Sequence, residues 1–298
     1  MTSTPASGPT RARADAESRR DRRRPEPPEP LPRPVADSHC HLDIADGPDG
    51  QWLPVEEAVA MAAAVGVPRI VQIGCDLPGA RWAVEAADRY DALVAGVALH
   101  PNEAPVLAAS GDLDAALDEI DRLTGSSSRV RAVGETGLDH FRTPEDGWKV
   151  QEDSFRAHIA LAKKHGKALA IHDRDAHADI LRVLAEEGAP DRVLMHCFSG
   201  DAEMARECVR RGYYLSFAGT VTFKNAEPLR QALREVPLER VLVETDAPYL
   251  TPSPYRGRPN ASYLIPITVR QIAQVKDVDV DTVCTSIAAA TAAVFGTW

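Results

Sequence analysis

The sequence predicts an α/β fold in which parallel strands and helices alternate eight times and close into a (β/α)8 TIM barrel over residues 35–298. Short runs of Val, Ile, Leu and Ala alternate with longer stretches whose apolar residues recur every three or four positions. Each parallel crossover needs a helix to return the chain to the same edge of the sheet. The 264 residues after residue 34 also suit the ~250 residues typical of such a barrel. An open doubly wound sheet is the alternative.

The eight strands are expected where a short apolar run is bounded by turn residues or charges. They are 35–41, 69–74, 92–99, 130–135, 168–172, 192–197, 213–218 and 240–245. Helices are expected between them, with examples at 55–65, 114–123, 151–165, 178–187 and 202–211. No glycine-rich phosphate loop follows any strand, which argues against the nucleotide-binding forms of the open sheet.

Residues 1–34 are expected to form a disordered tail that lies outside the single barrel domain. They hold eight Arg, five acidic residues and eight Pro, without apolar periodicity. The Arg cluster at 19–24 is followed by Pro and Glu, whereas an export signal needs an apolar stretch there. A contact between this tail and nucleic acid stays a minor hypothesis.

The composition is that of a soluble globular protein, with 44% hydrophobic and 26% charged residues. No run approaches the ~18 apolar residues needed to cross a bilayer, so no membrane contact is expected. The five Cys form no CxxC pair, which favours a reducing, cytoplasmic location. Residues 35–298 hold 26 basic and 39 acidic side chains, a net charge of −13. A polyanionic substrate would therefore need local positive charge, which metal ions supply.

Polar residues gather where the predicted strands end, and in a parallel barrel this edge carries the active site. Glu135 and Asp246 lie at such ends, together with five of the nine histidines. The histidines are His39, His41, His100, His172 and His196. His39 and His41 are two apart on one strand, so both point into the barrel mouth. Because so many imidazoles and carboxylates would otherwise be unpaired or repel one another, we expect a cation to organise them.

Six candidate ligands exceed what one catalytic Zn²⁺ with an open position needs, so two divalent ions are expected. The six are His39, His41, Glu135, His172, His196 and Asp246. Mg²⁺, Mn²⁺ and Zn²⁺ stay open as their identity. Two ions together ionise water near neutral pH and neutralise attacking and leaving oxygens, so the expected reaction is hydrolysis by a metal-activated water. Cys40 and Cys197 neighbour ligands on their strands and are expected to face away from the mouth.

Seven motifs in this chain resemble the TatD family of metal-dependent deoxyribonucleases, in the same order and at similar spacing. They are DSHCHLD at 37–43, HP at 100–101, GETGLDHFR at 134–142, IHDRDA at 171–176, HCFSG at 196–200, ETDAPYLTP at 244–252 and YRGRPN at 255–260. The resemblance runs from residue 35 to 296. It implies an amidohydrolase-like barrel that cleaves phosphodiester bonds of nucleic acid with two divalent metals, as an exonuclease on single-stranded DNA.

The resemblance also assigns roles to the candidate site residues. The metal ligands would form two groups bridged by Glu135, with His39, His41 and Asp246 on one ion and His172 and His196 on the other. Asp246 would orient or deprotonate the attacking water, so Asp246 and Glu135 would be the catalytic residues. Arg174 and Arg256 would bind substrate phosphate, to which the guanidinium geometry is well suited. His100 would lie near the substrate, with support of a ligand as the alternative.

Four positions depart from the family pattern, and none of them is a predicted metal ligand. Tyr255 replaces a histidine and Ala261 a glutamate, while His140 and Phe141 stand where paired tyrosines are commoner. The metal chemistry should therefore be retained, and the substrate preference is the property in question. Tyr255 and Phe141 are candidates for stacking on a base, with core packing as the alternative.

Three other functions stay open. A relative of the phosphotriesterases or dihydroorotases would bridge its metals with a carboxylated lysine, but the fourth strand ends in Glu135 and contains no lysine. The same centre could hydrolyse the ester of aminoacyl-tRNA or act as a small-molecule amidohydrolase. A catalytically silent barrel would not need competent residues at all six ligand positions. The expected partner is a nucleic acid, DNA first and RNA as the alternative, and the expected state is a monomer.

Overall fold

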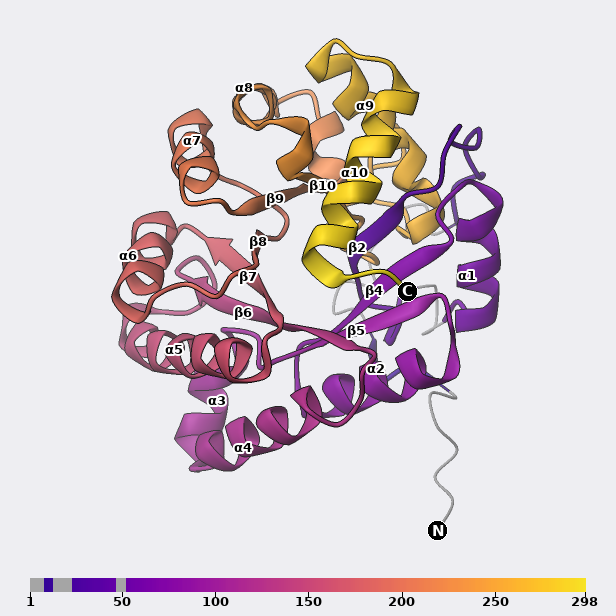
Figure 1. The fold of residues 1–298 in the computed structure, drawn as a ribbon. Coiled ribbons are helices and arrows are strands. Elements are labelled where there is room, and N and C mark those ends of the chain that lie inside the picture. The colour runs from indigo at the N-terminus through magenta and orange to yellow at the C-terminus, as the bar shows by residue number, and fades with distance from the viewer. Residues whose placement is uncertain (1–7, 13–22, 47–51) are drawn as a thin grey trace.

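The computed structural model describes residues 8–12, 23–46 and 52–298. Eight parallel strands form one sheet in the order β10, β9, β8, β7, β6, β5, β4, β2. Their bounds are β2 Ala36–Cys40, β4 Arg69–Gly74, β5 Leu93–Val97, β6 Val130–Asp139, β7 Ala168–Arg174, β8 Val193–Met195, β9 Tyr214–Phe217 and β10 Val241–Val243. The sheet curls into a ring with helices around it (Figure 1). The predicted α/β class and (β/α)8 barrel are thereby confirmed.

The ring closes between β2 and the segment that follows β10. An isolated parallel bridge joins these two segments, and the Asp246 N–H donates to the His39 carbonyl at 2.9 Å. The buried Asp37 carboxylate holds the same seam, accepting from the Thr245 N–H at 2.9 Å and the Thr245 hydroxyl at 2.5 Å. Closure therefore places a histidine of β2 beside the carboxylate that follows β10.

Ten α-helices accompany the strands in the described part of the chain. They are α1 Val55–Ala64, α2 Leu77–Arg89, α3 Glu103–Ser110, α4 Leu113–Thr124, α5 Trp148–His165, α6 His177–Glu187, α7 Ala202–Arg210, α8 Glu227–Glu235, α9 Ile265–Lys276 and α10 Val280–Phe295. The five helices predicted by range correspond to α1, α4, α5, α6 and α7. Short 3₁₀ turns add η2 Glu145–Gly147, η3 Gly219–Thr222, η4 Leu238–Arg240 and η5 Ser262–Leu264. Asp76, Asp201 and Asp279 begin α2, α7 and α10 by accepting a backbone N–H three residues on.

No single helix in the described ranges is long and apolar enough to cross a membrane. The pair Ser262–Lys276 and Val280–Phe295 passes such a test only jointly, across a bend of 109°.

The core has two layers because side chains alternate along each strand. On β4, Ile70 belongs to the layer between strands and helices, whereas Val71 and Ile73 belong to the layer inside the ring. The C-terminal end of α10 contributes Val294 and Phe295 to the inner layer, and in Figure 1 the last turn of α10 lies over the ring, while the end of the chain lies beside β4. The interior is therefore packed at the end where the strands begin, which leaves the opposite end for a polar site.

The described parts of residues 1–34 lie on the barrel, which differs from the expected disordered tail. Leu31 is 8% exposed, and its N–H donates to the Val65 carbonyl at 3.0 Å. The barrel also supplies donors to this segment: the Tyr263 hydroxyl donates to the Pro25 carbonyl at 2.7 Å, and Arg270 donates to two further carbonyls. Composition did not reveal this docking because the segment is held mostly through its backbone carbonyls rather than through its own apolar side chains.

The start of the described chain pairs with the loop after β2. Strand β1 (Arg11–Ala12) lies parallel to β3 (Ile44–Ala45), and the Thr10 hydroxyl donates to Asp43 at 2.6 Å. Farther along, Arg24 forms an ion pair with Asp46 at 2.6 Å. Arg19, Arg20 and Arg22 of the predicted basic cluster lie outside the described residues.

Candidate metal centre at the barrel mouth

The structure brings the predicted metal ligands together around Glu135, which lies within β6. One carboxylate oxygen, Oε1, is 2.6 Å from His172 Nδ1 and 2.9 Å from His196 Nε2. The other, Oε2, is 3.4 Å from His39 Nε2 and 3.9 Å from His41 Nε2. The two oxygens of one carboxylate therefore face two different pairs of imidazoles, which is the arrangement that a bridging ligand needs.

Asp246 completes the side of the centre formed by β2. Its Oδ1 is 3.4 Å from His41 Nε2 and 3.8 Å from His39 Nε2. Among the residues that the structure describes, three overlapping groups of side chains are close enough to hold an ion: His39, His41 and Glu135; His39, His196 and Asp246; and His100, Glu135 and His172. All six predicted ligands belong to at least one group, and His39 and Glu135 belong to two groups each.

Two glycines allow β6 to deliver Glu135 to this position. A Cβ on Gly137 would lie 2.0 Å from the carbonyl oxygen of His172, and one on Gly134 would lie 2.6 Å from Ala170. Their φ angles of +141° and +156° are also ones that residues with a side chain rarely adopt. The GETG sequence therefore lets β6 and β7 approach closely, so that Glu135 and His172 meet.

The buried ring of His39 fits a bound cation. His39 is fully buried, and neither of its ring nitrogens has a hydrogen-bond partner among the described residues. Burial lowers the pKa of His39, and the ring of His196, stacked at 3.8 Å, lowers it further. A buried, neutral imidazole without a partner is costly unless a ligand satisfies it, and neutral imidazole is the form that binds metal.

The bridging carboxylate is ionised, which is the other requirement for metal binding. Burial alone would raise the pKa of Glu135, but the imidazoles of His196 and His100 hold it well below its usual range. In the donor set of five imidazoles and two carboxylates, the imidazoles suit Zn²⁺, and the carboxylates also permit the harder ions Mn²⁺ and Mg²⁺.

Two groups behind the ligands orient the histidine rings. Glu244 is fully buried, and its Oε1 lies 3.1 Å from His196 Nδ1. The Ile73 carbonyl lies 3.0 Å from His41 Nδ1. Each contact favours a proton on Nδ1 and leaves Nε2 to face the centre. The sequence prediction assigned Glu244 no role, although it lies in the same strand-end segment as Asp246, two residues before it.

Two further residues at the centre were missed by the sequence prediction. Asp139 Oδ2 lies 3.3 Å from His172 Nε2 and accepts from the Asn102 side chain at 3.1 Å. Cys75, at the end of β4, donates from Sγ to Glu135 Oε2 at 3.3 Å. Burial raises the pKa of Cys75 to about 11, so the thiol keeps its proton. Asp139 stands within the GETGLDHFR motif, which was a signal for it, whereas nothing in the sequence singled out Cys75.

The two cysteines next to ligands behave differently from each other. Cys40 is fully buried between strands and helices, as predicted. Cys197 is only partly buried and lines a hollow after β8, so it is not enclosed in the core as Cys40 is. The reason is that β8 ends at Met195 and Cys197 has φ +43°, so strand alternation no longer sets its direction.

Of the three predicted substrate-contact residues, His100 follows β5, Arg174 ends β7, and Arg256 lies in the segment after β10. His100 Nε2 is 3.5 Å from Glu135 Oε1, which places it among the candidate ligands rather than outside them. The Arg174 guanidinium lies over the Phe141 ring at 4.0 Å, and that of Arg256 lies over Phe223 at 4.5 Å. Neither arginine forms an ion pair within the described ranges, so both positive charges are available to an anion.

The residues that depart from the family pattern have separate surroundings. His140 stacks on Trp148 at 3.9 Å, and Ala261 is buried with 7% exposure, so both have packing roles. The guanidinium of Arg258 lies 5.2 Å from the Tyr255 ring. Phe141 is 63% exposed, so core packing does not account for it and stacking on a base remains the prediction.

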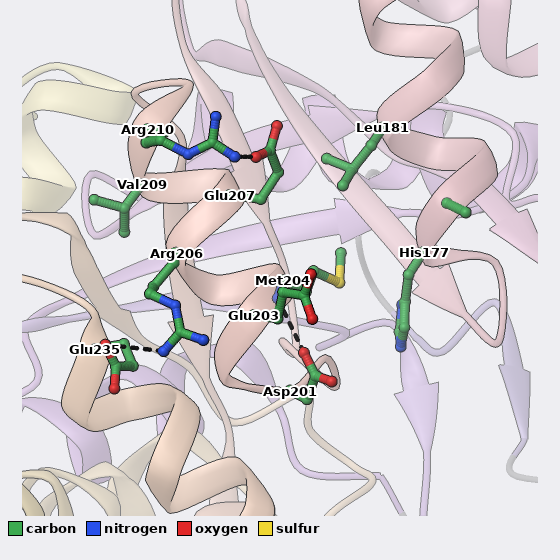
Figure 2. A pocket seen from close by; sticks show the side chains of 11 residues that line it. His177, Leu181, Asp201, Glu203, Met204, Arg206, Glu207, Val209, Arg210 and Glu235 are labelled. Atoms are coloured by element: carbon green, nitrogen blue, oxygen red, sulfur yellow. Dashed lines mark hydrogen bonds and ion pairs between the residues drawn. The ribbon is translucent and has the colours of Figure 1, made fainter.

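A separate hollow of about 800 Å³ lies between α6, α7 and α8 (Figure 2). Arg206 points toward Glu235, 3.3 Å away, and Arg210 forms an ion pair with Glu207. These charged side chains neutralise one another rather than converge on a common point. The hollow therefore lacks the features of a reaction centre, which are found at the barrel mouth instead.

Comparison with known proteins agrees with this site. The family described as TatD related DNase matches residues 36–296. An uncharacterised metal-dependent hydrolase of Mycobacterium tuberculosis, named TatD, is 48% identical over 80% of this chain and 89% of its own length. YabD of Bacillus subtilis, also an uncharacterised metal-dependent hydrolase, is 39% identical over 81% of this chain and 91% of its own length.

Solved structures share the fold. YJJV, a TatD homologue from Escherichia coli, superposes with a TM-score of 0.78 at 24% identity, covering 89% of this chain and 98% of that one. A TatD family hydrolase from Entamoeba histolytica also gives 0.78, at 19% identity, covering 90% of this chain and 100% of that one. The chain therefore belongs to the TatD family of metal-dependent hydrolases.

Proposed function

We propose that this hydrolase cleaves phosphodiester bonds of nucleic acid, acting as an exonuclease on single-stranded DNA with two divalent metal ions. The observation that carries the proposal is Glu135, whose two oxygens face separate imidazole pairs at 2.6 to 3.9 Å. The described match to TatD related DNase supports nucleic acid as the substrate class.

The ligand residues divide about the bridging carboxylate. His39, His41 and Asp246 would hold one ion, and His172 and His196 would hold the other, with Glu135 shared by both. Ions at these positions would supply Lewis-acid charge for a phosphate oxygen and allow water to ionise near neutral pH. His100 faces the same oxygen of Glu135 as His172, so we assign it to the side of the second ion.

The chain's own groups would then bind and orient the reactants. Asp246 lies at the open side of the centre with its side chain 16% exposed, where it can accept the proton of the attacking water. Arg174, at the end of β7, and Arg256, in the segment after β10, would bind phosphates on either side of the scissile bond. Local charge from these groups explains how a barrel with net charge −13 could bind a polyanion.

The test is the product ladder from single-stranded DNA labelled in turn at either end. Mg²⁺, Mn²⁺ or Zn²⁺ is added to metal-free protein, and EDTA and His39→Ala samples serve as controls. We expect cleavage with at least one metal, stepwise from one end, and loss of the ladder in both controls.

Absence of cleavage with every metal, by protein shown to be folded, would overturn the nuclease proposal. Turnover of a mischarged aminoacyl-tRNA or of a small ester by the same preparation would then identify the substrate class. A random mixture of internal fragments would retain the nuclease but reject the exonuclease assignment.

A further inference from the structure

A second hollow, of about 320 Å³, opens beside the metal centre between the loop after β8 and the turn η3 after β9. Cys197 and Ser199 line it on the β8 side, and Phe223 and Asn225 line it on the other. Cys197 follows the candidate ligand His196 directly in the chain. The hollow therefore begins one residue from the metal centre.

The chemistry of this hollow is that of a site for a flat, partly polar ring. Phe198, Phe223 and Leu229 provide apolar surface, while Ser199 and Asn225 provide groups that form hydrogen bonds. Its volume is at the low end of the ~300 to 1,000 Å³ of small-ligand sites, which suits one base rather than a base pair.

A positive charge lies next to the apolar side of the hollow. The Arg256 guanidinium lies 4.5 Å from the centre of the Phe223 ring, so one aromatic ring both lines the hollow and carries a cation. A nucleotide needs this combination, because its base stacks on an aromatic face while its phosphate requires a positive neighbour.

A second arginine lies over a phenylalanine ring on the other side of β8 in the strand order. Arg174, at the end of β7, lies over Phe141, which follows β6 and is 63% exposed. The hollow thus lies between two Arg and Phe pairs along the rim, as expected for a strand whose backbone crosses the mouth.

We infer that the hollow after β8 binds one unpaired nucleobase adjacent to the scissile phosphodiester, with Phe223 as its stacking surface. This inference rests on the proposed nuclease function, and it explains why the enzyme would prefer single-stranded DNA. A paired base cannot enter a site that takes one ring, so duplex DNA would be cut only where its end has opened.

The test combines a base deletion in the substrate with a substitution in the protein. A set of labelled single-stranded oligonucleotides, each with one abasic position, is cleaved by wild type, Phe223→Leu, Phe223→Trp and Arg256→Gln. Phe223→Leu keeps apolar bulk, so folding is preserved, and melting temperature and metal content are measured for each variant. Val209→Ala, in the hollow of Figure 2, is the control for loss of apolar surface elsewhere.

We expect the cleavage rate of wild type to fall by about tenfold when the abasic position is the one that would place its base in the hollow. Phe223→Leu should slow by a similar factor on intact DNA and lose the pause at the abasic position. Phe223→Trp should keep the pause, and Arg256→Gln should slow intact and abasic substrates equally.

Two other outcomes would separate failure of the base site from failure of the nuclease function. If wild type cleaves but shows no abasic pause, or Phe223→Leu keeps an unchanged pause, the base site is refuted while the nuclease stands. If wild type does not cleave any oligonucleotide, the proposed function itself fails.

Discussion

His158, which lies in α5, holds the backbone next to the candidate ligand His100, and its pH response is a quantitative test of the structure. Its Nε2 accepts from the Leu99 N–H at 3.1 Å, so Nδ1 must carry the proton that is shared with the Ser154 carbonyl at 2.7 Å. The ring is fully buried, and burial lowers its pKa from 6.5 to about 4. Only the neutral ring is compatible with both contacts.

The sign of the pH dependence follows from this lowered pKa. Between pH 6.5 and 4 the unfolded chain binds the proton and the folded chain does not, so stability falls as the pH decreases. Relative to neutral pH, His158 costs about 2 kcal/mol of unfolding free energy at pH 5 and about 3 kcal/mol below pH 4.

His158→Leu removes this titration. At pH 7.5 the variant should be less stable by about 2 kcal/mol, because the Leu99 N–H loses its acceptor. At pH 5 the difference between wild type and variant should shrink to about zero, since only wild type bears the proton cost. Urea unfolding at both pH values, with EDTA in every sample to remove metal linkage, measures the two differences. An equal difference at pH 7.5 and pH 5 would refute the reasoning.

Three further predictions concern the parts that position the site. Leu31→Ala should lower the unfolding free energy by about 2 kcal/mol, measured by urea unfolding, because Leu31 is an apolar anchor of the N-terminal segment; an unchanged midpoint would mean that the segment does not stabilise the barrel. Glu244→Gln should weaken metal binding about tenfold or more in calorimetric titration, because Glu244 orients the His196 ring; unchanged affinity would refute that role. Gly137→Ala should lower both melting temperature and metal affinity, because the new Cβ would meet the His172 carbonyl; a variant equal to wild type in both would contradict the close approach of β6 and β7.

The barrel was predictable because its strands are buried on both sides and appear as separate apolar runs. Strand ends then identified the candidate ligands without any knowledge of contacts, since parallel strands bring their carboxyl ends to one edge. Alternation also set the directions of His39 and His41, and the structure places both beside Asp246.

Features that depend on the path of loops and segments were not predictable. Cys197 lies beyond the end of β8, where alternation does not apply. Cys75 reaches Glu135 because the register through β5 places the end of β4 level with the middle of β6. The N-terminal segment docks through its backbone carbonyls, which every sequence possesses, so its composition carried no signal. Glu244 was visible as a strand-end carboxylate, but only its distance to His196 showed which ring it orients.

The most direct test of the account is to count the metal ions that the protein binds and to measure how their binding depends on Glu135. Metal-free wild type, Glu135→Gln and the exposed control Glu145→Gln are titrated with Mn²⁺ by calorimetry, and bound metal is counted by mass spectrometry. The account predicts two ions in wild type and in Glu145→Gln, with binding of both ions weakened at least about tenfold in Glu135→Gln. A wild-type protein that binds one ion at saturation, or a Glu135→Gln protein that retains two at wild-type affinity, would contradict a centre bridged by Glu135.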